Sequence, residues 1–223
     1  MNTIDVKSLI DRDLQVIWNN KRYQEEPITA QLIGRGYLAC QDMEKEALLF
    51  VGINPSYTKA AANNALSGNF GNLKQAGNSY KAFFRKFEEI AEEKNQLWTH
   101  LDLLFFRETQ QKMVEKLSRD KTGREFLQEQ IKLSEKVLKN LDPKIIIVSN
   151  TAARDLICKK EWLGYTTEFN SKLGTRILKF EDKSHPLHNK PIFFTSMLTG
   201  QRALDNGSFE RLKWHIDFVL DQL

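Results

Sequence analysis

The sequence predicts an α/β fold: a three-layer α/β/α sandwich around a central, mostly parallel four-stranded sheet, with a helical arm at the N-terminus. Two observations lead to this prediction. Short apolar runs rich in β-branched and aromatic residues alternate with longer segments whose apolar residues recur at helical spacing. This alternation of strand and helix favours parallel strands with helices on both faces.

The bulk composition suits a globular protein. The chain has 223 residues, of which 41% are hydrophobic and 28% are charged, enough apolar material for a full core. We divide it into an N-terminal helical extension, residues 1–46, and an α/β domain, residues 47–223. No apolar run approaches the roughly 18 residues of a membrane span, and the first residues lack the apolar core of a signal peptide. Cys40 and Cys158 lie far apart without metal-type spacing, so we expect a reducing, cytoplasmic location.

The N-terminal region predicts one helix followed by irregular chain. Residues 4–22 place apolar side chains at largely helical spacing. Residues 23–46 contain three breakers, Pro27, Gly34 and Gly36. These breakers indicate a connection without regular structure.

The core elements are expected to alternate after residue 46. The predicted strands are residues 47–53, 97–106, 142–150 and 190–197, and the predicted helices are residues 79–94, 124–141, 151–163 and 208–220. The first strand, ALLFVGI, is apolar throughout, as expected for a strand buried on both faces of a parallel sheet. Asn150 or Thr151 is the expected N-cap of the third helix, and Ser208 that of the last. Residues 176–180 are either an edge strand or part of an insertion.

Polar residues follow the carboxyl end of each predicted strand. They are Asn54 after the first strand, residues 102–107 at the second, Ser149 and Asn150 at the third, and residues 195–199 at the fourth. In open α/β sheets ligands bind beyond these strand ends. The first, second and fourth ends therefore predict one ligand-binding cleft.

Common cofactor and catalytic motifs are missing from the chain. It has no G-x-G-x-x-G after the first strand, no G-x-x-x-x-G-K-[ST], no H-E-x-x-H, no clustered cysteine and histidine set and no G-x-S-x-G. These absences argue against dinucleotide-binding, P-loop, zinc and α/β-hydrolase sites. We expect neither a metal nor an organic cofactor.

Residues 48–56, LLFVGINPS, followed by a helix that begins SYKAFFRKF, resemble motif 1 of the uracil-DNA glycosylase superfamily. They look most like the mismatch-specific uracil and thymine glycosylase branches, whose motif is Gly-Ile-Asn-Pro-Gly. The second motif of this family lies after the last core strand, where residues 193–216 stand here. The resemblance covers roughly residues 48–220. It implies base excision in DNA repair by a monofunctional glycosylase, which hydrolyses the N-glycosidic bond of a flipped-out damaged or mismatched base of the uracil type.

The resemblance also implies roles for individual residues. Asn54 would position the hydrolytic water, because this branch uses asparagine where others use aspartate. The backbone of Gly52 and Ile53 would donate hydrogen bonds to the base, and Phe70 or Tyr80 would stack on it. The complete base-binding set implied is Gly52, Ile53, Pro55, Phe70, Tyr80 and Asp102.

Two positions depart from the family pattern. Asp102 stands where many members carry an asparagine that recognises uracil, and a carboxylate can only accept hydrogen bonds. It would suit a base edge that donates, such as the amino group of cytosine or adenine. The usual histidine or asparagine before Pro-Ser is replaced by Ser196, which could donate one weaker hydrogen bond. The expected DNA contacts in the following loop are Thr199, Gln201 and Arg202.

Simpler interpretations compete with each assignment. Asn54 with Pro55 could form a plain turn, and Asp102 could cap a helix or pair with a lysine. The stripe of Phe83, Phe84 and Phe87 predicts core packing. His100, His188 and His215 are expected to be structural or on the surface.

The charge is compatible with a polyanionic partner. The net charge is +4 and the pI about 8.9, a mild basic excess. We expect DNA or a nucleotide as the partner, and no membrane. Two other functions stay open: a non-catalytic nucleic-acid or nucleotide-binding module on the same fold, and a hydrolase of free nucleosides or nucleotides.

Overall fold

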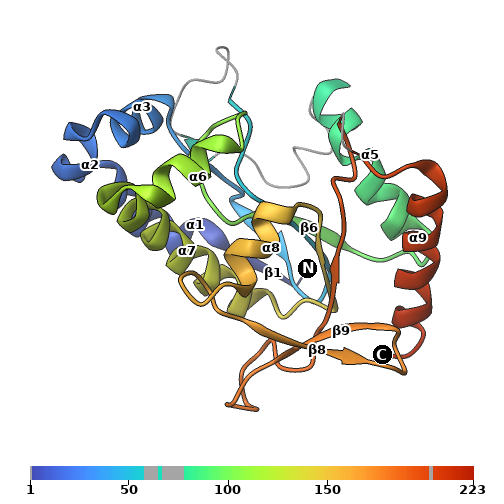
Figure 1. The fold of residues 1–223 in the computed structure, drawn as a ribbon. Coiled ribbons are helices and arrows are strands. Elements are labelled where there is room, and N and C mark those ends of the chain that lie inside the picture. Colours follow the sequence, from blue (N-terminus) through green and yellow to red (C-terminus); the bar gives the residue numbers. More distant parts are fainter. Residues whose placement is uncertain (1, 58–64, 67–77, 201–202) are drawn as a thin grey trace.

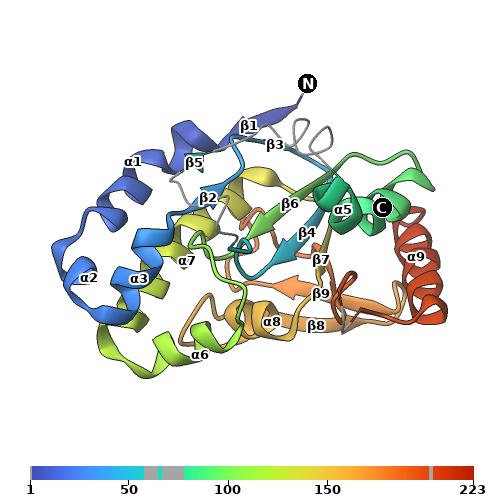
Figure 2. The ribbon, with the colours of Figure 1, turned by 90° about the horizontal axis from the view of Figure 1, so that it is seen from above.

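A computed structural model of the chain describes residues 2–57, 65–66, 78–200 and 203–223, with the backbone alone for residues 65–66 and 78–81. Its centre is a six-stranded sheet in the order β6–β4–β7–β10–β9–β8 (Figures 1 and 2). The strands are β4 (Leu48–Gly52), β6 (Trp98–Asp102), β7 (Ile145–Val148), β8 (Thr166–Asn170), β9 (Thr175–Lys179) and β10 (Pro191–Phe194). The first four strands in this order are mutually parallel, whereas β9 runs antiparallel to both of its neighbours, β10 and β8. The α/β class and the mostly parallel sheet are confirmed.

The prediction of a four-stranded sheet is wrong, because the β8–β9 hairpin extends it. Gly174 takes a positive φ of 64° in the tight turn, and the Asn170 side chain accepts hydrogen bonds from the N–H groups of Lys172 and Leu173. Residues 176–180 thus belong mainly to an inner strand, and β8 forms the edge. The hairpin was missed because β8, TTEFN, is largely exposed and lacks an apolar stripe.

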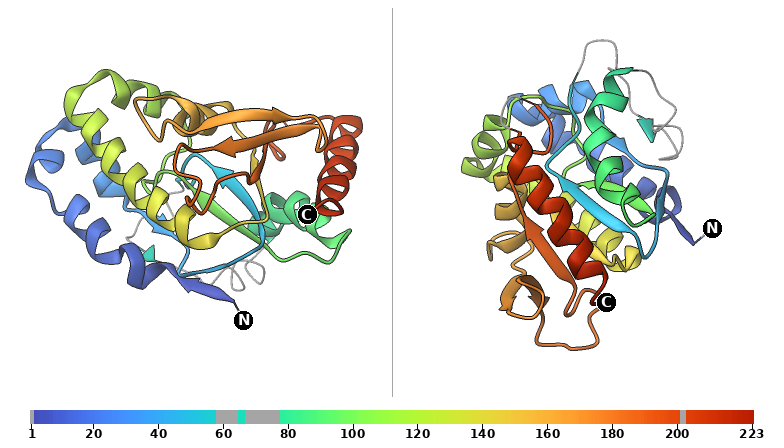
Figure 3. Two further views of the ribbon diagram at one scale, coloured as in Figure 1. Left: turned by 90° about the horizontal axis from the view of Figure 1, so that it is seen from below. Right: turned by 90° about the vertical axis from the view of Figure 1, so that its right-hand side faces the viewer.

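Helices cover both faces of the sheet (Figure 3). Alternate residues of each central strand face opposite sides. Val51 packs in one cluster with α1 (Val6–Trp18), α7 (Lys121–Leu141) and α8 (Thr151–Cys158). Phe50 packs in another with α5 (Asn78–Glu92) and α9 (Asn206–Leu220). The remaining described helices are α2 (Lys21–Glu25), α3 (Pro27–Arg35) and α6 (Lys112–Arg119).

The N-terminal region is more regular than predicted. Residues 23–46 contain most of α2, all of α3, and the short strands β2 (Leu38–Ala39) and β3 (Asp42–Glu44). Pro27 begins α3 instead of interrupting the chain, because proline is well suited to the first turn of a helix. β3 pairs with β1 (Thr3–Asp5), and β2 pairs with β5 (Ala65–Leu66).

The N-terminal residues share the core of the larger part of the chain. Trp18 and Tyr23 contact Phe126 of α7, with ring centroids 5.6 and 5.3 Å apart. β3 lies beside β6, the outer strand of the sheet. Residues 2–46 therefore pack against the rest of the described chain, with β3 beside the edge strand β6.

Two of the predicted helix caps can be checked. Asn150 caps α8 as expected, since its Oδ1 accepts from the N–H of Ala152 at 2.8 Å. Asp205, and not Ser208, caps α9, because the Asp205 carboxylate accepts from the Ser208 N–H at 2.9 Å. In the described part of the chain, no helix is both long and apolar enough to span a bilayer.

Gly123→Ala is expected to destabilise the protein by about 1–3 kcal/mol, because overpacking at a close contact carries that cost. A Cβ at Gly123 would lie 2.6 Å from the backbone oxygen of Leu117, so α6 and α7 would have to separate. Gly34→Ala in α3 is the matched control, since nothing lies within 4 Å of its Cβ position and alanine favours a helix. Urea denaturation should show a lower unfolding free energy for Gly123→Ala alone. Equal values for the two variants would contradict the close contact.

Candidate functional site

A cavity of about 500 Å³ lies at the carboxyl ends of the parallel strands. Its lining includes Asn54 after β4, Asp102 at the end of β6, Asn150 after β7 and Thr199 after β10. The cleft expected from the first, second and fourth strand ends is therefore present, and the third strand end contributes as well. The N-terminal region supplies a further part of the wall, including Cys40.

The strand order explains why the cavity opens here. The chain leaves β4 for β6 on one side and reaches β7 on the other side of β4, which is a topological switch point where α/β sheets bind ligands. The Ser149 N–H still donates to the Val51 carbonyl at 3.3 Å. Beyond that bond, the N–H groups of Ile53 and Asn54 donate to no described residue. The two strands separate at this point and leave donors beside the cavity.

The Asn54 side chain is held in one orientation. Its Nδ2 donates to the carbonyl of Glu108 at 2.6 Å and to that of Pro55 at 3.0 Å. Turning the amide over would place Oδ1 against two carbonyl oxygens, and neither of them can donate a hydrogen bond. Oδ1 is therefore the part of the amide left for a ligand, and the Asn54 side chain can act there only as an acceptor.

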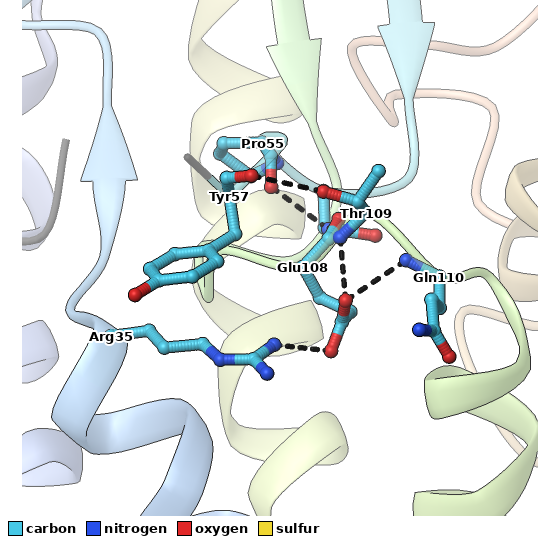
Figure 4. A network of polar contacts seen from close by, with 7 residues as sticks. Arg35, Pro55, Tyr57, Glu108, Thr109 and Gln110 are labelled. Carbon is cyan, nitrogen blue, oxygen red and sulfur yellow. Dashed lines mark hydrogen bonds and ion pairs between the residues drawn. The ribbon is translucent and has the colours of Figure 1, made fainter. Parts of the chain in front are cut away.

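A polar network joins the segment after β4 to the segment after β6 (Figure 4). The Glu108 N–H donates to the Pro55 carbonyl at 2.9 Å, and the Thr109 hydroxyl donates to the Tyr57 carbonyl at 3.0 Å. The Glu108 carboxylate forms an ion pair with Arg35 of α3, whose guanidinium lies 4.7 Å from the centre of the Tyr57 ring. The network fixes the backbone that follows Asn54 in the chain.

Glu108 is ionised within this network. Burial alone would raise its pKa, but hydrogen bonds from the Gln110 N–H, the Arg35 guanidinium and the Thr109 N–H together lower the pKa below its ordinary value. The folded protein therefore favours the carboxylate more strongly than the unfolded chain does. Its stabilising effect is complete above the unfolded pKa of about 4.3 and is lost as the pH falls through the folded pKa.

Glu108→Gln is expected to lower the unfolding free energy by about 1–3 kcal/mol near pH 7, because it removes charge-assisted hydrogen bonds at a buried site. The difference from wild type should shrink as the pH falls below about 4, as measured by urea denaturation across the pH range. Glu115→Gln is the control, since Glu115 and its partner Arg119 are 63% and 76% exposed and such pairs contribute little. A constant difference at all pH values would contradict the ionised state.

Asp102 and His100 form a pair on one face of β6. The Nε2 atom of His100 lies 3.4 Å from Oδ1 of Asp102, and the two side chains are 9% and 19% exposed. Gly52 lies opposite Asp102 on β4, and a Cβ there would be 2.2 Å from the same carboxylate oxygen. The missing side chain of Gly52 thus makes the room that Asp102 occupies.

Phenylalanines of α5 form an aromatic wall beside this pair. Phe84 and Phe87 are buried, with exposed fractions of 7% and 1%, as predicted for core residues. Phe83 differs from that prediction: it is 41% exposed and lines the cavity. Its ring makes an edge contact with Phe84 at 4.9 Å between centroids, so the supported ring offers an apolar surface to a planar ligand.

The structure brings most of the described candidate residues together. Those that line the cavity are Gly52, Ile53, Asn54, Pro55, Asp102 and Thr199. Ser196 is exposed and does not line it, because β10 ends at Phe194 and the chain next presents Met197 and Leu198 instead. Phe70, Gln201 and Arg202 lie outside the described residues, and of Tyr80 only the backbone, within α5, is described.

Sequence reasoning missed His100, Phe83 and Glu108. His188 and His215 do contact backbone groups in structural positions, but His100 lines the cavity. The spacing of His100 and Asp102 was an available signal, because residues two apart on a strand share a face. No sequence signal distinguished Phe83 from the rest of its stripe.

Two other chemistries find no support at this site. Burial, together with the nearby Asp102 charge, raises the pKa of the Cys40 thiol to about 12, so Cys40 is protonated near neutral pH and is a poor nucleophile. No group of three potential ligands among histidine, cysteine, aspartate and glutamate is placed to hold a metal ion within the described residues.

Comparison with protein-family models, with curated proteins and with solved structures finds no match to this chain.

Proposed function

We propose that this protein hydrolyses an N-glycosidic bond of a nucleobase, as a monofunctional DNA glycosylase of the uracil-DNA-glycosylase type. The observation that carries the proposal is the fixed Asn54 amide, whose Oδ1 is left as an acceptor beside the cavity. An acceptor in that position can hold a water molecule by one hydrogen and orient its oxygen. The resemblance of residues 48–56 to a glycosylase motif assigns this role to the same asparagine.

The cavity has the size and surfaces that the reaction requires. Its volume of about 500 Å³ is in the range of small-molecule sites, about 300–1,000 Å³. Phe83 offers a ring for stacking, and the free N–H groups of Ile53 and Asn54 offer donors. A base within a duplex would have to rotate out of the helix to enter.

The proposed reaction uses water as its only co-reactant. The C1′–N bond breaks, and its electron pair leaves with the base. The water oxygen bonds to C1′, and the proton that the water loses is balanced by the proton that the base takes up. Asn54 holds and orients the water, and the fixed backbone around it excludes other geometries. Such positioning, together with preorganised dipoles, can supply much of the rate of a glycosidase-type reaction.

The experiment that tests the proposal is a substrate screen. Labelled duplexes with uracil, thymine mismatches, hypoxanthine, alkylated bases or mispaired normal bases are incubated with the protein, and abasic sites are then cleaved with alkali. Wild type should produce breaks at the modified or mispaired position, and Asn54→Ala should not. If no duplex is cut while nucleic-acid binding is the same in both proteins, the hydrolase proposal fails.

A binding module without catalysis is the second candidate. The observation in its favour is the position of Ser196, which is exposed and does not line the cavity. The group that replaces the second family motif is therefore not placed to act on a ligand in the pocket. Binding that persists unchanged in Asn54→Ala, without strand breaks, is the result expected of this alternative.

A further inference from the structure

Asp102 places a carboxylate in the wall of the cavity that Asn54 also lines. It ends β6, its side chain is 19% exposed, and it lines the cavity. One carboxylate oxygen is confined between His100, at 3.4 Å, and the backbone of Gly52. Because Gly52 has no side chain, the carboxylate lies close against β4, level with Gly52 and two residues before Asn54.

The side chains at this end of the cavity present acceptors. Oδ1 of Asn54 is an acceptor because the amide nitrogen is committed to two backbone carbonyls. Asp102 as a carboxylate has two oxygens that accept and no group that donates. Backbone donors are also present, since the N–H groups of Ile53 and Asn54 donate to no described residue. A ligand that meets the two side chains must therefore bring hydrogens to them.

We propose that the pocket selects a nucleobase with an exocyclic amino group, of the guanine, adenine or cytosine class, and rejects the uracil and thymine edge. The part of this inference that concerns which base is released rests on the proposed function, whereas the part that concerns which base binds does not. An amino group, alone or beside a ring N–H as in guanine, donates to the Asp102 carboxylate. The edge of uracil has a carbonyl oxygen on each side of its single N–H, and each oxygen would be repelled by the carboxylate.

The charge of the leaving group points the same way. Uracil departs with the electron pair of the broken bond and so develops negative charge, which a neighbouring carboxylate disfavours in a site sheltered from water. A base that carries amino groups can take up a proton before it leaves and then departs neutral. A carboxylate beside that base stabilises the protonated form. Asp102 thus opposes loss of uracil and assists loss of an amino-bearing base.

His100 acts as a positioning residue in this arrangement. Its ring packs against Phe84 and Phe87, with centroids 5.6 Å away in each case, so its position is set by the aromatic wall. Its Nε2 atom faces the Asp102 oxygen that lies over Gly52. The contact orients the carboxylate plane, so the remaining lone pairs are available toward the ligand.

The first measurement is binding of free deoxynucleosides by calorimetry. Wild type should bind deoxyguanosine, deoxyadenosine or deoxycytidine about tenfold or more tightly than deoxyuridine and thymidine, the discrimination typical of a well-matched polar edge. Asp102→Asn should reduce or reverse this ratio, because its amide can donate to a base carbonyl. Asp155→Asn on α8 is the control, since Asp155 pairs with Lys159 and does not line the cavity.

The second measurement is cleavage of duplexes that carry the same five bases in mispairs, which separates the two proposals. The inference is supported if wild type binds amino-bearing nucleosides more tightly and Asp102→Asn loses this preference. This holds even if no duplex is cut and the hydrolase proposal fails. Equal or tighter binding of deoxyuridine by wild type overturns it, even if uracil duplexes are cut and the hydrolase proposal holds. No measurable binding of any nucleoside also overturns it. If Asp102→Asn does not fold, the ratio of the wild-type dissociation constants for the two classes of nucleoside decides by itself whether the inference holds.

Discussion

Asn54→Ala is expected to lower kcat for base release by about 10²-fold or more, because misplacing a reacting group by about 1 Å can have that effect. The reason is that alanine removes Oδ1, the only part of the side chain left to hold a water molecule. KM should change far less, because the other residues of the cavity wall are untouched. Steady-state cleavage kinetics on the best duplex found in the screen gives both quantities.

The same substitution also removes two hydrogen bonds to the backbone, so its effect on stability must be separated. Loss of the bonds to Glu108 and Pro55 is expected to lower the unfolding free energy by about 1–3 kcal/mol. Asn20→Ala is the matched control: Asn20 caps α2, and its loss carries a cost of about 0.5–2 kcal/mol far from the cavity. Equal loss of kcat in both variants would mean that Asn54 matters only for folding.

Gly52→Ala is expected to displace the Asp102 carboxylate, destabilise the protein by about 1–3 kcal/mol and weaken ligand binding at the cavity. The new Cβ would lie 2.2 Å from Oδ1 of Asp102 and 3.0 Å from Cε1 of His100. A contact of 2.2 Å between carbon and oxygen is far inside van der Waals separation, so the side chain must move. Urea denaturation measures the stability, and nucleoside calorimetry measures the binding.

A double-mutant cycle identifies the clash as the cause. Asp102→Ala removes the oxygen that the new Cβ would meet, so the double variant Gly52→Ala with Asp102→Ala should be more stable than the two single effects predict together. Residues in contact commonly show interaction energies of about 0.5–3 kcal/mol in such cycles. Additive effects would show that Asp102 is free to move away and that Gly52 is not required for its placement.

The core of the fold was predictable because its strands carry strong signals. β4 and β7 are buried over nearly their whole length, so their sequences are continuously apolar. The N-terminal helices α2 and α3 were not predicted, since they have five and nine residues and pack against each other and against α7. The β8–β9 hairpin was missed for a similar reason: its edge strand is exposed and is defined by pairing with β9.

The candidate site was predictable in part. Asn54 and Asp102 were placed at neighbouring strand ends, and the structure brings both to one cavity. Ser196 was assigned by its position after the last strand, but that position does not say which way a side chain points, and it is exposed. Helical periodicity places Phe83 in the core with Phe84 and Phe87; all three line the cavity, but Phe83 is 41% exposed whereas the other two are buried.

The sequence by itself determined which segments become buried strands and which polar residue follows each one, because both are local properties of the chain. Only the tertiary structure decided which atoms of those residues are left for a ligand. Asn54 becomes an acceptor because its amide nitrogen donates to Glu108, 54 residues away, and Asp102 takes its place because Gly52 lies opposite. Which donors and acceptors of the site remain for a ligand therefore depends on contacts between segments distant in sequence, and a local sequence pattern cannot predict these contacts.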